Sequence, residues 1–386
     1  MNSEFEIDAE NLEIARRWCL EHGDDWSVSD QAGRGGTAPV FGICSPNGDR
    51  ALKIYDVAFS SGEKGEIEEK RIKQQIALGT HDCPYLIMVY DGGRFENRLF
   101  LLMNRAPGTE LLKCLKDVPR DKIRSIVDQI AQACIFLQNN GLCHRDIKSE
   151  NIFVTEDFGH ATLLDISVLR NIHDPIGLGT DHDGKLPVVA TARYSPPEYL
   201  FRLLEASPMS WHALNVYQLG GLLHDLIMRE PLFQVEYRQS EGNRYRFAWA
   251  VATIDPVVRA TDVDLDLVIT ARRALDKRWE RRSQLSLEEF LADAETQRMH
   301  SLEALGLTSR GPPDLGQSSV ASKLKRINDI AEDLENGIRD LLSGRGVTAR
   351  HLVKPGANDL SKCLLFSWRS QGSEVVPHCW TVWQRG

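Results

Sequence analysis

The order of apolar and polar positions divides the chain into a first part built from short strands and a longer part built from helices. Residues 8–22 repeat apolar side chains at helical spacing and stop at Gly23, which predicts a short packing helix. From residue 26 to residue 104, short apolar runs alternate with glycine-containing turns. This pattern predicts strands near 26–31, 40–44 and 51–55, a helix over 62–78, and two strands within 84–104.

Two of the turns between these strands carry a signal of their own. Asn47-Gly48 predicts a tight hairpin, because both residues accept the positive φ of a type I′ turn. Asp91-Gly92-Gly93 predicts the turn between the two strands of 84–104. The sheet is therefore expected to be mostly antiparallel, with one helix beside it.

Beyond residue 109 the apolar spacing is helical almost throughout, apart from a loop-rich stretch at 144–197. Helices are expected at 121–140, 214–229, 245–254, 264–275 and 286–296. A small β lobe followed by a larger helical lobe is an α+β fold. The 386 residues are enough for one such core and a smaller appended unit.

The last part of the chain has a different composition. Residues 306–319 are rich in Gly, Pro and Ser, which is typical of a linker. Past this linker, an apolar seam between Leu324 and Leu341 predicts a helix, and two β-like runs follow at 362–369 and 375–384. The predicted organisation is an N-terminal helix at 1–25, a first lobe at 26–106, a second lobe at 107–300, a linker at 301–319 and a C-terminal helix and β-hairpin module at 320–386.

Composition argues against several classes of protein. The net charge of −9 and the pI of about 5.7 argue against sequence-independent nucleic-acid binding, which needs a basic surface. No apolar run approaches the roughly 20 residues needed to cross a bilayer, and the acidic start MNSEFEIDAE does not resemble a signal peptide. The eight cysteines are scattered, which indicates reduced thiols rather than disulfides or a zinc site. We therefore expect a soluble, cytoplasmic protein that binds neither membrane nor nucleic acid.

One short segment carries most of the chemical information. His144-Arg145-Asp146-Ile147-Lys148-Ser149-Glu150-Asn151 resembles the catalytic loop HRDxKxxN of eukaryotic-like serine/threonine protein kinases at every defining position. Phosphoryl transfer needs an acceptor oxygen aimed in line, a cation near the moving charge and metal ligands on the phosphate oxygens. The resemblance implies a bilobal protein-kinase-like fold. In it, Asp146 would accept the substrate proton, Lys148 would stabilise the transferred phosphoryl group and Asn151 would bind one Mg²⁺ ion.

A second metal ligand is expected after the apolar run 161–164. Asp165 follows this run where the kinase family has its metal-binding aspartate, and the resemblance makes it the second Mg²⁺ ligand. The family's Asp-Phe-Gly reads Asp165-Ile166-Ser167 in this chain. Because Ser167 removes the backbone freedom of glycine, metal binding is expected here but a regulatory flip of the loop is not.

The phosphates of ATP are expected to meet the first lobe. Gly33, Gly35, Gly36 and Val40 resemble the kinase glycine-rich loop GxGxxGxV, with Ala38 in the place of the third glycine. This departure predicts a rearranged contact between the loop and the phosphates.

Lys53, in the strand 51–55, matches the family's lysine that holds the α- and β-phosphates, and it needs a carboxylate from the helix over 62–78. Glu68 is the first choice because Ile72, four residues on, would face the same way and pack beside Ile166. Glu69 is the alternative.

The same resemblance places the adenine ring between apolar residues of the two lobes. Val40, Ala51 and Phe153 would form its walls, with Met103 at the gatekeeper position. Main-chain groups from Asn104 to Ala106 would meet the edge of the ring.

Residues 190–198 resemble the family's GTxxYxAPE segment, which contacts the substrate. Thr191, together with Lys148, is the arrangement of serine/threonine rather than tyrosine kinases. Glu198 would form a buried ion pair with Arg281 or Arg282.

Asn215 is a departure from the family, which has an aspartate there to hold the backbone of the catalytic loop. Asparagine keeps one acceptor but loses the charge, and charged hydrogen bonds are about twice as strong as neutral ones. We expect this support of the loop to be weakened without being abolished.

The sequence thus predicts transfer of the γ-phosphoryl group of ATP to a serine or threonine of a protein substrate, with Mg²⁺. Two alternatives stay open on the same fold. Ala38, Ser167 and Asn215 favour a catalytically weak pseudokinase that acts as a nucleotide-binding scaffold, and transfer of AMP is compatible with the same residues.

The role of 320–386 also stays open. This module contains three tryptophans close together, Trp368, Trp380 and Trp383. They either pack the module or form a docking surface for a partner or for a second copy of the chain.

Overall fold

The computed structural model describes residues 2–35, 37–166, 169–171 and 192–292, together with three strands nearer the C-terminus. It divides the chain into two compact units, 1–300 and 301–386. The first unit contains a small β lobe and a larger helical lobe, which confirms the predicted α+β architecture.

A five-stranded antiparallel sheet forms the small lobe. Across the sheet the order is β1 (Ser27–Arg34), β2 (Pro39–Cys44), β3 (Arg50–Ile54), β5 (Arg98–Asn104) and β4 (Val89–Phe95). Between β2 and β3 the turn lies where Asn47-Gly48 predicts it. It is not a type I′ turn, because only Gly48 has a positive φ, of 93°, and the Gly48 N–H donates to the Ser45 oxygen at 3.0 Å.

The prediction of a turn at Asp91-Gly92-Gly93 is wrong. These residues lie inside β4, and the chain turns at Glu96-Asn97 instead, where Glu96 has a φ of 50°. Gly92 is required for close packing: a Cβ atom there would lie 2.8 Å from Cγ2 of Ile72. The glycine therefore marks the approach of a helix to the sheet, not a change of chain direction.

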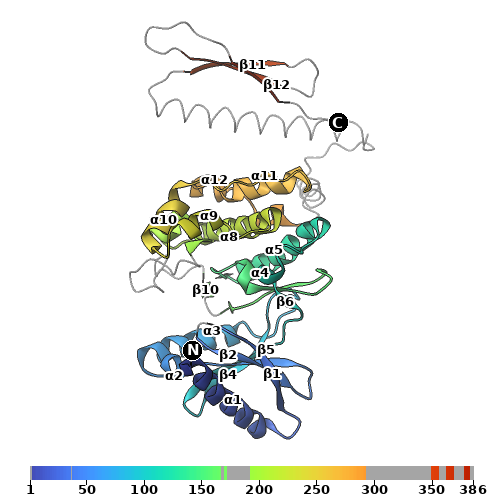
Figure 1. The fold of residues 1–386 in the computed structure, drawn as a ribbon, viewed down its shortest axis with the longest axis vertical. Helices are drawn as coiled ribbons and strands as arrows, with labels where there is room; N and C mark the ends of the chain where they lie inside the picture. The colour runs from blue at the N-terminus through green and yellow to red at the C-terminus, as the bar shows by residue number, and fades with distance from the viewer. Residues whose placement is uncertain are drawn as a thin grey trace. The chain divides into compact units, whose positions relative to one another are not determined.

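Both faces of this sheet are covered by helices, as the alternation of side chains along a strand allows. On one face, Ile14, Trp18 and Cys19 of α1 (Asn2–His22) pack against Leu52, Ile54 and other residues of β2, β3 and β5. On the other face, Ile72 of α3 (Gly62–Ala77) packs in a cluster with Leu101 of β5. A short helix, α2 (Val57–Ser60), precedes α3. Figure 1 shows α1 in dark blue along the strands.

Helix α8 (Pro208–Met228) forms the centre of the helical lobe and is buried along most of its length. It begins six residues before the predicted start, because the hydroxyl of Ser207 caps it by accepting from the Ser210 N–H at 3.1 Å. Helices α5 (Ile123–Asn139), α10 (Arg244–Thr253) and α11 (Leu265–Ala274) lie close to their predicted bounds. The helix expected at 286–296 is, within the described residues, only a 3-10 turn, η5 (Leu287–Phe290).

The remaining elements of the first unit are short. The helices are α4 (Leu111–Cys114), η1 (Arg120–Lys122), η2 (Ser149–Asn151), α7 (Pro197–Leu200), α9 (Gln234–Gln239) and α12 (Trp279–Arg282). The strands are β6 (Thr109–Glu110), β7 (Leu142–Cys143), β8 (Ile152–Val154), β9 (Ala161–Leu163) and β10 (Arg170–Asn171). They form two small sheets, β6-β8-β9 and β10-β7.

Main-chain hydrogen bonds join the segment before β4 to the helical lobe. The Leu163 N–H donates to the Tyr85 oxygen at 2.8 Å, and the Ile87 N–H donates to the Leu163 oxygen at 2.9 Å. These bonds fix β9, and therefore the residues just after it, against the small lobe.

The second unit contains an antiparallel sheet of β11 (Ala349–Pro355), β12 (Lys362–Trp368) and β13 (His378–Val382), in that order. The sequence predicts the last two strands but not β11. The predicted helix between Leu324 and Leu341 lies outside the described residues. No helix in the described part of the chain is long and apolar enough to span a bilayer.

Candidate active site

The loop from His144 to Lys148 connects β7 to η2, and its first residue, His144, anchors it in the interior. The side chain of His144 is fully buried, and its Nε2 lies 2.9 Å from the main-chain oxygen of Leu164. Burial lowers the pKa of His144, which favours the neutral ring in the interior. Arg145 has a φ of 70°, in the left-handed region that residues other than glycine rarely adopt and that clusters at functional sites.

Two predicted catalytic side chains, Asp146 and Lys148, meet the predicted metal ligand Asn151 at the end of this loop. Nζ of Lys148 lies 2.8 Å from Oδ2 of Asp146. The side-chain amide of Asn151 donates to the main-chain oxygen of Asp146 at 2.7 Å and to its Oδ2 at 2.9 Å. Burial alone would lower the pKa of Lys148, but the nearby Asp146 carboxylate raises it above the ordinary value. Lys148 is therefore positively charged beside Asp146 at neutral pH.

Asp165 lies just after β9 and is tied to the same group through the main chain. The N–H of its neighbour Leu164 donates to the Asn151 oxygen at 2.7 Å. Asp165 is exposed and has a φ of 52°. A carboxylate and an amide oxygen are hard donors, and Mg²⁺ takes one or two protein ligands and completes its shell with water and phosphate oxygens. The pair Asn151 and Asp165 fits that donor set.

Lys53 lies in β3, where its backbone pairs with Val40 of β2 and Leu101 of β5. Its ammonium group lies 5.1 Å from the centre of the Tyr55 ring. Burial alone would lower the pKa of Lys53, but Tyr55, Asp165 and Glu68 together raise it well above its ordinary value. The ammonium group is therefore charged and lies within electrostatic range of both carboxylates.

The structure separates the two candidate partners of Lys53 on α3. Glu68 is buried and faces the interior, whereas Glu69 lies at the surface, paired with Lys73 at 3.0 Å and Arg94 at 3.2 Å. The direct ion pair expected between Lys53 and Glu68 is not formed among the described side chains. Oε1 of Glu68 instead accepts from Nη1 of Arg71 at 2.5 Å, because Arg71 lies one turn along the same helix.

The glycine-rich loop joins β1 to β2 as predicted. Gly33 pairs with Val40 across the two strands, and the Gly35 N–H donates to the Ala38 oxygen at 2.9 Å. Ala38 is completely buried, so its methyl group fills the interior where the family pattern has its third glycine. Gly36 lies outside the described residues.

Two of the residues predicted to surround adenine are direct neighbours across the small sheet. Ala51 pairs with Met103 across β3 and β5, and both Met103 and Phe153 are half-buried. The Asn104 N–H donates to the Met88 oxygen at 2.9 Å and is therefore not available to a bound ring. The main-chain donors left for the ring edge are those of Arg105 and Ala106.

Gln218, which is not among the predicted site residues, supports the catalytic loop. Its Nε2 donates to the Arg145 oxygen at 2.7 Å, and its Oε1 accepts from the Ile147 N–H at 3.2 Å. Gln218 thus holds the backbone on both sides of Asp146. Asn215, expected in this role, accepts instead from Sγ of Cys143 at 3.1 Å. The spacing of three residues on α8, which places both on one face, was the available signal.

A second missed residue, Asp225, joins the loop to the segment that precedes α7. Its Oδ2 accepts from Oγ of Ser149 at 2.7 Å and from the hydroxyl of Tyr194 at 2.5 Å, and its Oδ1 accepts from the Leu232 N–H at 2.7 Å. Burial raises the pKa of Tyr194 well above its ordinary value, so the hydroxyl stays protonated and donates. Thr191 lies outside the described residues.

Glu198 forms a buried ion pair, and the structure decides between its two predicted partners. Nη2 of Arg282 donates to Oε1 of Glu198, and both side chains are almost completely buried. Arg281 lies near the surface, 3.7 Å from Asp276. This pair fixes α7, directly after the segment with Tyr194, to α12.

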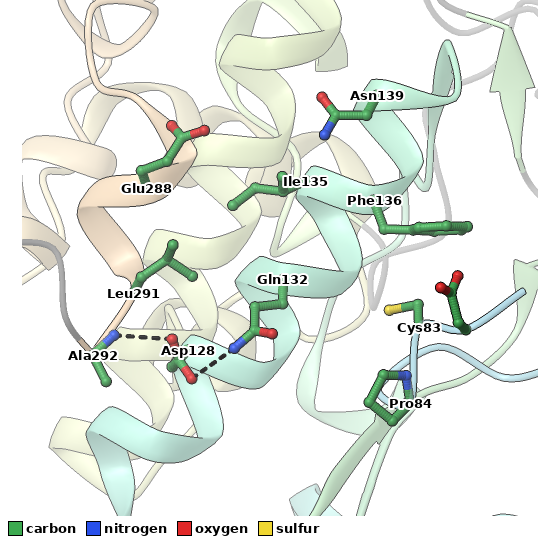
Figure 2. Close-up of a pocket in the computed structure, with 11 residues that line it drawn as sticks. Cys83, Pro84, Asp128, Gln132, Ile135, Phe136, Asn139, Glu288, Leu291 and Ala292 are labelled. Atoms are coloured by element: carbon green, nitrogen blue, oxygen red, sulfur yellow. Dashed lines mark hydrogen bonds between the residues drawn. The ribbon is translucent and has the colours of Figure 1, made fainter. Parts of the chain in front are cut away.

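A hollow of about 770 Å³ lies on the helical lobe between α5, η5 and the loop before β4 (Figure 2). The lining includes Cys83, Phe136 and Leu291, together with Asp128, which accepts from the Ala292 N–H and from Gln132. Its lining contains none of the residues predicted to bind nucleotide or metal, so the hollow is separate from the candidate active site.

The family model of the protein kinase domain matches residues 26–299. The chain belongs to the protein kinase family. The match covers both lobes and begins after α1. The small sheet with α3 and the lobe around α8 are thus the two lobes of a kinase domain, and the recognition made from the catalytic loop is confirmed.

Curated relatives of this kinase domain include kinases from a frog and from a bacterium. Aurora kinase A-A of Xenopus laevis is 24% identical over 233 residues, which are 59% of this chain and 53% of that protein. Serine/threonine-protein kinase PknF of Mycobacterium tuberculosis is 26% identical over 260 residues, 57% of this chain and 53% of that protein. The chain thus spans about half the length of the curated relatives it matches.

Proposed function

We propose that this chain is a serine/threonine protein kinase that transfers the γ-phosphoryl group of ATP to a hydroxyl group of a protein substrate. The observation that carries the proposal is the group formed by Asp146, Lys148 and Asn151, with Asp165 tied to Asn151 through the Leu164 N–H. Phosphoryl transfer depends on positioning and charge stabilisation, and this group supplies a base, a cation and two metal donors.

In the proposed reaction, Asp146 accepts the proton of the substrate hydroxyl while the hydroxyl oxygen forms a bond to the γ-phosphorus. The bond between that phosphorus and the β–γ bridging oxygen breaks, and ADP leaves with the electron pair. Lys148 lies within 2.8 Å of the Asp146 carboxylate, where its charge stabilises the phosphoryl group in transit. The hydrogen bonds from Asn151 orient the carboxylate.

The nucleotide would lie between the lobes. Lys53, whose raised pKa keeps it charged, would hold the α- and β-phosphates, and the glycine-rich loop would hold them from the other side. Asn151 and Asp165 would hold Mg²⁺, which would neutralise the phosphate charge when it is bound. Val40, Ala51, Met103 and Phe153 would enclose the adenine ring.

Serine/threonine specificity rests on Lys148 and on the expected role of Thr191. The curated relatives named as serine/threonine kinases, PknF among them, support the same class.

Intact mass spectrometry of the protein after incubation with Mg-ATP and a serine-containing acceptor protein tests the proposal. A phosphate-sized addition that requires Mg²⁺ is the expected result. An AMP-sized addition would indicate transfer of a different part of ATP, and saturable ATP binding without any addition would indicate a scaffold. Either outcome would overturn the proposed function.

A further inference from the structure

Helix α1 lies outside the part of the chain that matches the kinase family, yet it contacts the glycine-rich loop directly. Its apolar face packs on the sheet through Ile14 and Trp18. Its polar side carries Asp8 and Asn11, which reach Arg34 at the end of β1 and Asp56 just after β3.

Arg34 stands between Gly33 and Gly35 and forms ion pairs with two carboxylates at once. Its Nη1 donates to Asp8 of α1, and its Nη2 donates to Oδ2 of Asp56 at 2.7 Å. The Asp8, Arg34 and Asp56 side chains are 19%, 24% and 11% exposed, so this group is largely shielded from water. Charged hydrogen bonds in such surroundings are stronger and less screened than those of exposed pairs.

Asp56 also contacts the second end of the loop, just before β2. Its main-chain N–H donates to the Thr37 oxygen at 3.0 Å, while its Oδ1 accepts from Nδ2 of Asn11 at 2.7 Å. Asn11 is fully buried and is itself oriented by Nε of Arg98, which donates to it at 3.0 Å. Both ends of the loop, at Arg34 and Thr37, are therefore connected to α1 through Asp56.

A glycine-rich loop is free to adopt many conformations, and fixing its backbone costs conformational entropy. A ligand that must order the loop bears that cost on binding, whereas a loop that is ordered beforehand binds more tightly. The contacts of α1 restrict the loop in the absence of ligand.

We propose that α1 is part of the nucleotide site, with Asp8 and Asn11 acting through Arg34 and Asp56 as positioning residues for the glycine-rich loop. The inference rests on the proposed function, because the loop is expected to meet the phosphates of ATP. The helix therefore sets the affinity for ATP rather than the rate of the chemical step.

Steady-state kinetics of the full chain with Mg-ATP test this inference. Asp8→Ala removes the α1 carboxylate that Arg34 contacts, and we expect KM for ATP to rise about fivefold with kcat within about twofold of wild type. Asp8→Glu keeps a carboxylate and should restore most of the affinity. The matched control is Arg17→Ala, which breaks the ion pair of α1 with Glu96 at the β4–β5 turn, at 2.7 and 2.9 Å, and should leave KM unchanged.

Hydrogen exchange of the amides in residues 33–40, measured without nucleotide, separates this inference from the proposed function. We expect faster exchange in Asp8→Ala than in wild type, and no change in Arg17→Ala. Unchanged exchange in Asp8→Ala, or an equal change in the two variants, would overturn the role of α1 whether or not the chain turns over ATP. A wild-type protein that does not bind Mg-ATP would overturn the proposed function, and it would leave the exchange comparison to decide the role of α1.

Discussion

The side-chain amide of Asn151 donates one hydrogen bond to the main-chain oxygen of Asp146 and a second to its carboxylate. The residue proposed to bind metal therefore also fixes the orientation of the proposed base. Leu164 N–H, bonded to the oxygen of Asn151, extends the same arrangement to Asp165. Base and metal ligands are thus coupled through one asparagine.

Replacement of Asp165 tests the metal site. Asp165→Ala removes the carboxylate proposed to hold Mg²⁺ with ATP, so the stabilisation of the protein by ATP should no longer increase when Mg²⁺ is added. Thermal-shift titration with ATP, with and without Mg²⁺, measures this. Glu156→Ala, an exposed carboxylate in the β8–β9 turn, is the control and should behave as wild type. Equal Mg²⁺-dependent shifts for Asp165→Ala and wild type would contradict the assignment.

The support that Gln218 gives to the catalytic loop has a measurable consequence. Gln218→Leu leaves the Arg145 oxygen and the Ile147 N–H buried without this partner, at a cost of about 1–3 kcal/mol for each group that finds no other. We expect a lower unfolding free energy and a fall in kcat of about tenfold, because Asp146 lies between the two groups. Within the described part of the chain, Asn215→Leu removes the bond from Cys143, and it should change kcat less than twofold. Comparable losses of kcat in the two variants would contradict this role of Gln218.

Because Arg282 forms a buried ion pair with Glu198, replacing it should lower the unfolding free energy far more than replacing its neighbour Arg281. Arg282→Met leaves the Glu198 carboxylate buried without its cation and should lower the unfolding free energy by about 3–5 kcal/mol. Arg281→Met removes an ion pair near the surface, whose contribution is about 0–1 kcal/mol. Urea unfolding of the two variants compares them directly. Similar stabilities of the two variants would contradict the idea that Arg282→Met leaves the Glu198 carboxylate without a compensating partner.

Lys277 predicts how stability changes with pH. Burial lowers its pKa from 10.5 to about 8, even though Nζ donates to the Val251 oxygen at 2.5 Å. Between these two pKa values the unfolded chain binds more protons than the folded one, so this residue makes the protein more stable as pH rises through that window. The contribution between pH 7 and pH 9 is about 1 kcal/mol.

Urea unfolding at several pH values checks this prediction. The difference in stability between wild type and Lys277→Met should change in favour of wild type from pH 7 to pH 9. The same difference for Lys116→Met, an exposed lysine, should stay constant. A constant difference for Lys277→Met as well would mean that its pKa is not lowered.

Much of the fold could be predicted because its signals are local. The apolar spacing identifies α5, α10 and α11 without reference to the rest of the chain. In the same way, residues 144–151 identify the catalytic loop by their own sequence. Gly92 misled the prediction because glycine has two uses, a turn and a close approach, and only the position of Ile72 decides between them. Strand β11 carries no comparable local pattern.

The support of the site could not be predicted for a different reason. Gln218 and Asp225 act on backbone or hydroxyl groups far away in sequence. The spacing between Asn215 and Gln218 places both on one face of α8, but it does not show which groups that face contacts. Similarly, both Glu68 and Glu69 suit a partnership with Lys53, and only the rotation of α3 places Glu68 inside. The sequence could therefore propose reacting groups but not the residues that hold them.

The most direct test of the central proposal is the transfer of radiolabelled γ-phosphate from ATP to an acceptor protein by wild type and by Asp146→Asn, at saturating Mg-ATP. Asparagine keeps the size of the side chain but cannot accept the proton, so transfer should fall by about 10²–10⁴-fold while ATP binding is retained. Transfer by Asp146→Asn at the wild-type rate would contradict the assignment of Asp146 as the base.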